Sequence, residues 1–262
     1  MGSLIPYFGG KTRLAKRIIE KIPAHGCYVE VFAGSATVLF TKEPSKAEVL
    51  NDFDQELVTL YRVIKHHPLE FHRQFELSLV SRDEFARMLQ VVPETLTDIQ
   101  RAVRYFYLQK NSFGGKVTGQ TFGTSTSGPP RLNLFNLERT IHDAWLRLAQ
   151  VTIERLDFRK LIPKYDRPHT LFFLDPPYWK IPGYRHDFKE QDFHDLANTL
   201  SGIQGRCLMT INDTPEVREI FKGFKIEEVQ LRYSMSRNGK ARGKEHTELL
   251  VANYDAVMVF LI

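Results

Sequence analysis

Four consecutive residues in the second half of the chain have the composition of a reactive centre. The apolar run Leu171–Leu174 predicts a buried strand, which ends in Asp175, Pro176, Pro177 and Tyr178. The two prolines fix their φ angles and remove two backbone donors, so the carbonyl oxygens there lack a regular secondary-structure partner. We therefore expect a carboxylate, unpaired carbonyls and an aromatic ring to be held rigidly at the carboxyl end of a strand. The other interpretation is a Pro-Pro turn that only ends the strand.

This set of groups suits an exocyclic aromatic amine, whose lone pair is delocalised into the ring. The Asp175 carboxylate and the Pro176 carbonyl would accept its two N–H bonds and free the lone pair to attack an in-line methyl group, while Tyr178 stacks on the base. Such acceptors act strongly only when they are preorganised in a dry pocket. An amine inside duplex DNA is out of reach, so the base would have to be flipped into the pocket. Aromatic residues that follow closely would either stack there or pack in the core: Trp179, Tyr184 and Phe188.

A second set of residues suits a nucleoside ligand. A predicted strand ending at Phe32 runs into the small residues Ala33, Gly34, Ser35 and Ala36. Small residues let a ligand approach the backbone at the carboxyl end of a strand, where open α/β sheets bind ligands. Asp52 ends the next predicted strand, and a carboxylate about twenty residues on can accept both hydroxyls of a ribose. The alternatives are a turn that uses glycine for packing only and an aspartate that caps the following helix.

The amino-terminal segment Tyr7–Thr12 contains Gly10-Lys11-Thr12, which looks like the end of a phosphate-binding loop. That loop needs a glycine five residues before its Gly-Lys pair and a strand ahead of it. The chain has Ile5 at that position with four residues before it, so the nucleotide-hydrolase interpretation fails. Tyr7 and Lys11 instead suit a ligand with both a carboxylate and a sulfonium, because a lysine pairs with the carboxylate and a ring face attracts the positive sulfur.

The elements that must position these residues alternate along the chain. Short apolar runs predict seven buried strands, at Tyr28–Phe32, Glu48–Asn51, Val151–Ile153, Leu171–Leu174, Arg206–Ile211, Ile226–Arg232 and Glu248–Asn253. Helix patterns lie between several of them, for instance at Phe193–Leu200 and Pro215–Phe221, which indicates crossover units and a mainly parallel sheet. Only Asn238–Lys244 separates the last two strands, and that spacing suits a hairpin with an antiparallel strand.

Residues 55–150 interrupt the alternation with four amphipathic helix patterns, at Leu57–Ile64, Arg82–Leu89, Ile99–Lys110 and Leu137–Leu148. Between the last two lies the Gly-, Ser- and Thr-rich segment Asn111–Arg131, and loops of that length are usually functional or disordered. We therefore divide the chain into an α/β domain of residues 1–54 and 151–262 and a mostly helical insertion of residues 55–150.

The composition of the 262-residue chain, 42% hydrophobic and 26% charged, is that of a globular protein. A net charge of +5 is compatible with a polyanionic partner but also with a merely solvated surface. Basic residues concentrate in 101–150 and 232–245, and two such clusters could line one nucleic-acid groove. The two cysteines sit in apolar runs and are expected to be reduced, and no apolar stretch could span a bilayer. We expect a cytoplasmic protein without a membrane partner, and the scattered histidines predict no metal site.

These motifs resemble those of the Dam-type (D12 class) DNA adenine-N6 methyltransferase family over nearly the whole chain. The residues that carry the resemblance are, in family order, Tyr7–Lys11, Phe32–Ala36, Asp52, Asp175–Tyr178 and Ser236–Gly239. Two departures are Tyr7, where the family often has tryptophan, and Ala36, where it has glycine, and we expect both to adjust affinity. Segment 111–131 does not match the recognition hairpin of members that methylate GATC, so the target sequence stays open.

The resemblance implies a Rossmann-like class I methyltransferase fold, in which a mainly parallel seven-stranded sheet has an antiparallel last strand and residues 55–150 form a target-recognition insertion. It implies S-adenosylmethionine as cofactor, bound by Tyr7, Gly10, Lys11, Phe32, Ala33, Gly34, Ser35, Asp52, Asp157, Phe158 and Asp175. Double-stranded DNA is the implied partner, with no obligatory protein partner. Its expected contacts are Lys110, Asn111, Lys116, Arg131, Arg237, Asn238, Lys240 and Arg242.

Three rival functions stay open from the sequence. A related enzyme could methylate the N4 amine of cytosine, or an amine of RNA or of a protein side chain. The order of the motifs argues against the second rival, and the aspartate that leads the 175–178 motif favours adenine in this resemblance. A catalytically silent DNA-binding module is the third rival, and the intact 175–178 motif together with Lys11 and Asp52 argues against it.

Overall fold

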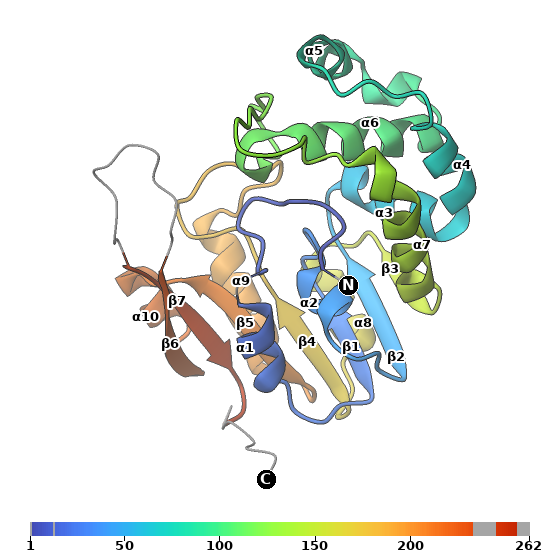
Figure 1. The fold of residues 1–262 in the computed structure, drawn as a ribbon. Helices are drawn as coiled ribbons and strands as arrows, with labels where there is room; N and C mark the ends of the chain where they lie inside the picture. Colours follow the sequence, from blue (N-terminus) through green and yellow to red (C-terminus); the bar gives the residue numbers. More distant parts are fainter. Residues whose placement is uncertain (1, 13, 233–244, 256–262) are drawn as a thin grey trace.

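The computed structural model describes residues 2–12, 14–232 and 245–255 (Figure 1). Its strands are β1 (Cys27–Glu30), β2 (Ala47–Asn51), β3 (Val151–Glu154), β4 (Thr170–Leu174), β5 (Arg206–Asn212), β6 (Lys225–Arg232) and β7 (Glu245–Ala252). They form one sheet in the order β3-β2-β1-β4-β5-β7-β6. The first five strands run parallel, and β7 is antiparallel to both β5 and β6. This order confirms the expected Rossmann-like class I methyltransferase fold with its antiparallel last strand.

Two hydrophobic layers enclose the sheet, because the strands alternate their side chains between its faces. Along β4, Leu171 and Phe173 belong to one layer, whereas Phe172 and Leu174 belong to the other. Helices α8 (Phe158–Tyr165), α9 (Glu190–Ser201) and α10 (Pro215–Ile220) cover the second face. Helices α1 (Ala15–Glu20) and α2 (Thr37–Thr41) cover the first.

The segment between β2 and β3 gathers at one end of the sheet (Figure 1). It holds α3 (Gln55–His66), α4 (Pro68–Arg73), α5 (Arg82–Gln90), α6 (Asp98–Asn111) and α7 (Leu137–Leu148), with short 3-10 turns η1 (Pro93–Thr95), η2 (Phe113–Gly115) and η3 (Leu134–Asn136). Their apolar side chains join the layer under α1 and α2 in one continuous core. The predicted insertion thus extends one layer of the sheet and shares its core.

Further sequence expectations concern cysteines, membranes and metals. Cys27 and Cys207 are buried free thiols on the α8–α10 side of the sheet. Within the described ranges, no helix is both long and apolar enough to cross a membrane. Among the same residues, no three His, Cys, Asp or Glu side chains are grouped as a metal ion requires.

Candidate active site

A cavity of about 310 Å³ opens at the carboxyl ends of β1, β2, β3 and β4. In the sheet, β1 lies between β2 and β4. The chain runs from β1 through β2 to β3 on one side and then crosses to β4 on the other, so the strand order reverses between β1 and β4. A crevice forms outside the strand ends at such a switch point, and open α/β sheets bind ligands there. The cavity is lined from each strand end: by Phe32 and Gly34 after β1, Asp52 after β2, Asp157 and Phe158 after β3, and Asp175 after β4.

The small-residue turn after β1 approaches the cavity with its backbone. Gly34 has φ +47°, and a Cβ atom there would lie 3.2 Å from the Tyr7 ring. Ala36 also has a positive φ of 49°, which an L-residue adopts at a cost of about 1–2 kcal/mol. This is the position where the family has glycine, so the departure seen in the sequence leaves the turn geometry in place. The Tyr61 hydroxyl donates to the Gly34 carbonyl at 2.7 Å and fixes the turn.

Asp52 faces the cavity next to this turn. Its Oδ2 accepts the Gly34 backbone N–H at 3.0 Å, and its Oδ1 accepts the Asp54 N–H at 2.9 Å. Burial raises the pKa of Asp52 to about 6, although these backbone donors act in the opposite direction. The cap of α3 is Asp54, whose side chain accepts the Glu56 N–H. Asp52 therefore lines the cavity instead of capping the helix, which was its alternative interpretation.

Lys11 connects the amino-terminal segment to the 175–178 motif. It is 5% exposed, and its Nζ lies 2.8 Å from Asp175 Oδ1 and 2.7 Å from the Gly9 carbonyl oxygen. The same ammonium lies 4.8 Å from the centroid of the Tyr178 ring. The sequence suggested Lys11 as a partner for a ligand carboxylate, whereas here it holds the proposed reactive carboxylate.

Two polar side chains of β5 that the sequence did not single out hold the 175–178 motif and the residue after it. Thr210 Oγ1 donates to Asp175 Oδ1 at 2.8 Å. Asn212 holds the backbone of Trp179 from both sides, because its Oδ1 accepts the Trp179 N–H at 2.9 Å and its Nδ2 donates to the Trp179 carbonyl at 3.2 Å. The sequence marked only their location, since Thr210 lies near the end of the predicted strand Arg206–Ile211 and Asn212 directly follows it, where ligands bind in such sheets.

The Tyr178 phenol stays protonated at neutral pH. Burial raises its pKa well above 10, and the negative charges of Asp175 and Glu248 raise it further. Glu248 is a buried carboxylate of β7 that sequence reasoning also missed. Pro177 lines the cavity and Pro176 is buried beside it.

Aromatic rings form one wall of the cavity. The Phe32 centroid lies 6.1 Å from that of Phe158 and 5.4 Å from that of Phe188. Asp157, just before Phe158, caps α8 by accepting the Arg159 N–H at 2.8 Å. Of the aromatic residues after the motif, Tyr184 and Phe188 line the cavity. Trp179 instead packs against Phe193 in the core, at 5.0 Å between centroids.

The loop after the motif contributes side chains that the sequence did not single out. Arg185 lines the cavity with its Nε 3.6 Å from Asp54 Oδ2. The adjacent His186 packs edge-on against Phe53, with 5.0 Å between ring centroids. This loop thus lies against the residues that follow β2 and closes one side of the cavity.

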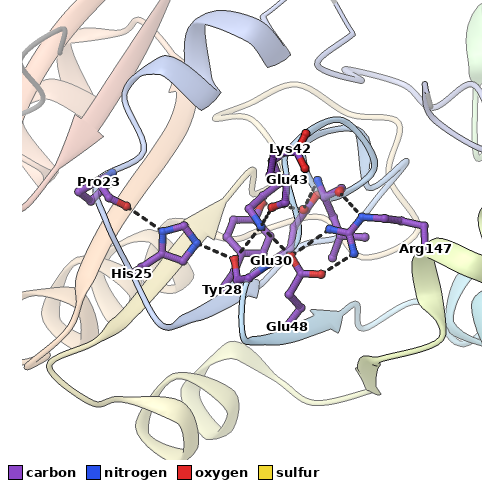
Figure 2. Close-up of polar contacts among 10 residues, drawn as sticks. Pro23, His25, Tyr28, Glu30, Lys42, Glu43, Glu48 and Arg147 are labelled. Atoms are coloured by element: carbon purple, nitrogen blue, oxygen red, sulfur yellow. Dashed lines mark hydrogen bonds and ion pairs between the residues drawn. The ribbon is translucent and has the colours of Figure 1, made fainter. Parts of the chain in front are cut away.

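A buried polar network reaches the cavity at Glu30, which lines it (Figure 2). Glu30 Oε2 accepts hydrogen bonds from the Tyr28 hydroxyl at 2.8 Å and the Leu39 N–H at 3.1 Å. Burial raises the pKa of Glu30 to about 8, against the effect of these two donors. From the other side, Arg147 of α7 donates to the Leu39 carbonyl at 3.0 Å and forms an ion pair with Glu48. The insertion therefore holds α2, the helix that follows the cavity turn.

The expected DNA contacts fall into three groups. Lys116 and Arg131 are exposed, and Lys110 at the end of α6 is half-buried, where desolvation lowers its pKa to about 8. Asn111 is buried and its amide donates to the Tyr107 carbonyl at 2.9 Å, so it holds the end of α6 and is not kept among the proposed contacts. The remaining candidates lie outside the described residues: Arg237, Asn238, Lys240 and Arg242.

Other basic residues of the 101–150 cluster serve the fold. Arg101 forms an ion pair with the buried Glu56, and Arg104 Nη1 lies 3.8 Å from the same carboxylate. Arg147 pairs with Glu48, as described above. The count of basic residues in the sequence therefore overstates the positive charge that this segment offers to DNA.

Fold and site together define a Rossmann-like methyltransferase with a nucleoside-sized cavity beside an Asp-Pro-Pro-Tyr motif. The model of the family described as D12 class N6 adenine-specific DNA methyltransferase matches residues 7–235, and the chain belongs to this family. The family's reaction, methylation of the N6 amine of adenine in DNA with a methyl donor of the S-adenosylmethionine type, is therefore the activity of this chain.

Full-length relatives agree with this assignment. The chain is 28% identical to the type II methyltransferase M.CviBI of Paramecium bursaria Chlorella virus NC1A, over 97% of the chain and 100% of the relative. It is 23% identical to the DNA adenine methylase of Escherichia coli (strain K12), over 92% of each. A solved rRNA methylase from Streptococcus thermophilus aligns over 92% of this chain and 96% of the methylase chain. The similarity is weak, with a TM-score of 0.37 and 10% sequence identity.

Proposed function

We propose that this chain transfers the methyl group of S-adenosylmethionine to a flipped-out adenine, with Asp175 as the residue that binds the N6 amine. The observation that carries the proposal is the 2.8 Å contact between Lys11 Nζ and Asp175 Oδ1 in the wall of the cavity. It joins the amino-terminal cofactor segment to the 175–178 motif, so cofactor and base would meet at one carboxylate.

The cavity has the groups that a nucleoside with an amino-acid tail requires. Asp52 would accept the ribose hydroxyls, and the rings of Phe32 and Phe158 would flank the adenine of the cofactor. The turn at Ala33, Gly34 and Ser35 allows close approach, next to Tyr7 and Gly10. An ammonium has three donors, and Lys11 uses two of them on Asp175 and Gly9, which leaves one for the carboxylate of the cofactor tail.

The motif would activate the amine by holding both of its N–H bonds. Lys11 and Thr210 both contact Asp175 Oδ1, so Oδ2 is the oxygen assigned to the substrate, with the Pro176 carbonyl as the second acceptor. The bound cofactor would supply an electrophilic methyl group to the N6 nitrogen and would leave as the thioether. Asp175 would hold the amine during transfer and would accept the proton that the methylated nitrogen releases. Tyr178 and Pro177 would hold the base plane.

The proposal also assigns different roles to the parts of the chain. We assign residues 1–54 and 151–262 to cofactor binding and catalysis, and residues 55–150 to target recognition. The exposed cations Lys116 and Arg131 of the insertion would contact the DNA backbone together with the half-buried Lys110. Arg237, Asn238, Lys240 and Arg242 are assigned to DNA on their sequence alone. Backbone contacts of this kind position the duplex without reading its sequence.

The test is transfer of a labelled methyl group to DNA from a methylation-free host, followed by analysis of the nucleosides. We expect N6-methyladenine with the wild type and a loss of turnover of about 100-fold or more with Asp175→Ala, because a preorganised acceptor is worth that much. Asp213→Ala is the matched control and should keep its turnover, since Asp213 follows β5 and its carboxylate pairs with Arg218. Label in cytosine, or unchanged turnover of Asp175→Ala, would contradict the proposal.

A further inference from the structure

The buried amide of Gln109 lies between residues 111–123 and the amino-terminal segment of the cavity. Gln109, in the last turn of α6, is 0% exposed. Its Nε2 donates two hydrogen bonds, one to the Pro6 carbonyl at 2.8 Å and one to the Gly115 carbonyl at 2.7 Å. Pro6 directly precedes Tyr7 of the cavity, whereas Gly115 lies in the segment that follows α6. One side chain therefore binds both Pro6 and Gly115, which are 109 residues apart in the sequence.

The recognition side of this contact is also ordered by Gln109. Gln120 Nε2 donates to Gln109 Oε1 at 3.0 Å and to the Lys116 carbonyl at 2.9 Å. Further along the segment, the Gly123 N–H donates to the Asn111 carbonyl at 2.7 Å and closes residues 111–123 into a compact loop. All the hydrogen-bonding atoms of the Gln109 amide are thus engaged, two donors and one acceptor, and residues 111–123 are built around it.

The cofactor side continues into the cavity by direct contact. Gly115 has φ +68°, and a Cβ atom there would lie 3.0 Å from the Tyr7 backbone nitrogen. The Tyr7 ring in turn lies against Gly34, where a Cβ atom would be 3.2 Å away. Residues 111–123 therefore lie in contact with Tyr7, and Tyr7 lies in contact with the turn after β1. Figure 1 shows this amino-terminal segment, in dark blue, between the sheet and the end of α6.

We propose that Gln109 is a positioning residue that couples DNA engagement by residues 111–123 to cofactor binding at Tyr7. The inference rests on the proposed function, because it takes DNA as the ligand of that loop and S-adenosylmethionine as the ligand of the cavity. DNA that contacts this loop would hold Pro6 and Tyr7 in place through the Gln109 amide, so the cofactor would bind more tightly. By linkage, the cofactor would tighten DNA binding by the same factor.

The test measures the dissociation constant of S-adenosylhomocysteine by calorimetry, with and without a duplex built around the adenine that sequencing shows to be methylated. We expect DNA to tighten binding to the wild type by about 5-fold or more, a usual size for such coupling. Gln109→Met keeps the side-chain length and removes both donors, and its ratio should fall below about 2-fold. Gln120→Met, which cuts only the recognition side, should give an intermediate ratio and serves if Gln109→Met does not fold.

Tyr107→Phe is the matched control. Tyr107 lies on the same helix and is buried, and its hydroxyl donates to the Leu79 carbonyl at 2.8 Å within the insertion. Its loss should lower the melting temperature and leave the coupling ratio of the wild type. A ratio near 1 in the wild type, or the wild-type ratio in both Gln variants, would overturn the inference while methylation of adenine by the wild type upholds the proposed function. A wild type that neither binds the cofactor nor methylates DNA would overturn both.

Discussion

Lowering the pH from 7 to 5 should weaken cofactor binding, because the cavity holds a carboxyl group that titrates in this range. Burial raises the pKa of Asp52 to about 6. The ionised form offers both oxygens to the ribose hydroxyls, whereas the protonated form has lost one acceptor. With this pKa the ionised fraction falls from about 90% at pH 7 to about 10% at pH 5. The expected loss of affinity is therefore about tenfold, or about 1.4 kcal/mol.

The assay is calorimetric titration of S-adenosylhomocysteine at pH 7, 6 and 5. Asp52→Asn is the comparison, because the amide presents one oxygen and does not titrate. We expect the variant to bind at pH 7 about as weakly as the wild type does at pH 5, with no further change on acidification. Glu30 also lines the cavity, but its pKa of about 8 places its titration above this range. Equal affinity of the wild type at pH 7 and pH 5, or an equal slope in Asp52→Asn, would refute the reasoning.

Three further predictions concern the turn after β1, the buried network around Glu30 and the basic residues of segment 232–245. Gly34→Ala and Gly119→Ala both place a side chain at positive φ, at a cost of about 1–2 kcal/mol each. Only the new side chain at position 34 also meets Tyr7, so Gly34→Ala should lower the melting temperature more. Equal losses of melting temperature would contradict this. Because the folded state raises the pKa of Glu30 above its ordinary value, the native protein binds more protons and loses stability as the pH rises from about 4.5 to 8. Glu30→Gln should remove the part of that decrease above pH 6, where Asp52 is mostly ionised, and an unchanged decrease in urea unfolding at pH 6 to 8 would contradict this. Replacement of Arg237, Lys240 and Arg242 together by alanine should weaken DNA binding and flatten its dependence on salt. An unchanged salt slope would place these three residues away from the DNA backbone.

The strands, the turn after β1 and the 175–178 motif were predictable from the sequence because their signals are local. A buried strand shows a short run of consecutive or alternating apolar residues, and all seven predicted runs overlap observed strands. The cavity followed from topology, since the residues after β1, β2 and β4 must meet at one edge of a parallel sheet. Asp52 and Asp54 show the limit of that reasoning, because only the geometry shows which of the two caps α3.

The missed residues depend on contacts between distant parts of the chain. Thr210 reaches Asp175 across 35 residues, and no local pattern marks that pair. In the same way, Arg147 belongs to a basic cluster in the sequence, yet its partner Glu48 lies 99 residues away in β2. Charge counts report composition and cannot show whether a cation is paired inside the fold. Asn111 was expected at the DNA for the same reason, because the sequence does not show that its side chain is buried in the fold.

The central proposal is that Asp175 binds the amine of a flipped-out adenine. The most direct test is modification-sensitive sequencing of DNA from a methylation-free host that expresses either the wild type or Asp175→Ala. The account predicts N6-methyladenine at one recurring sequence with the wild type and at none with the variant. Methylation of cytosine by the wild type, or the same adenine pattern from Asp175→Ala, would contradict it.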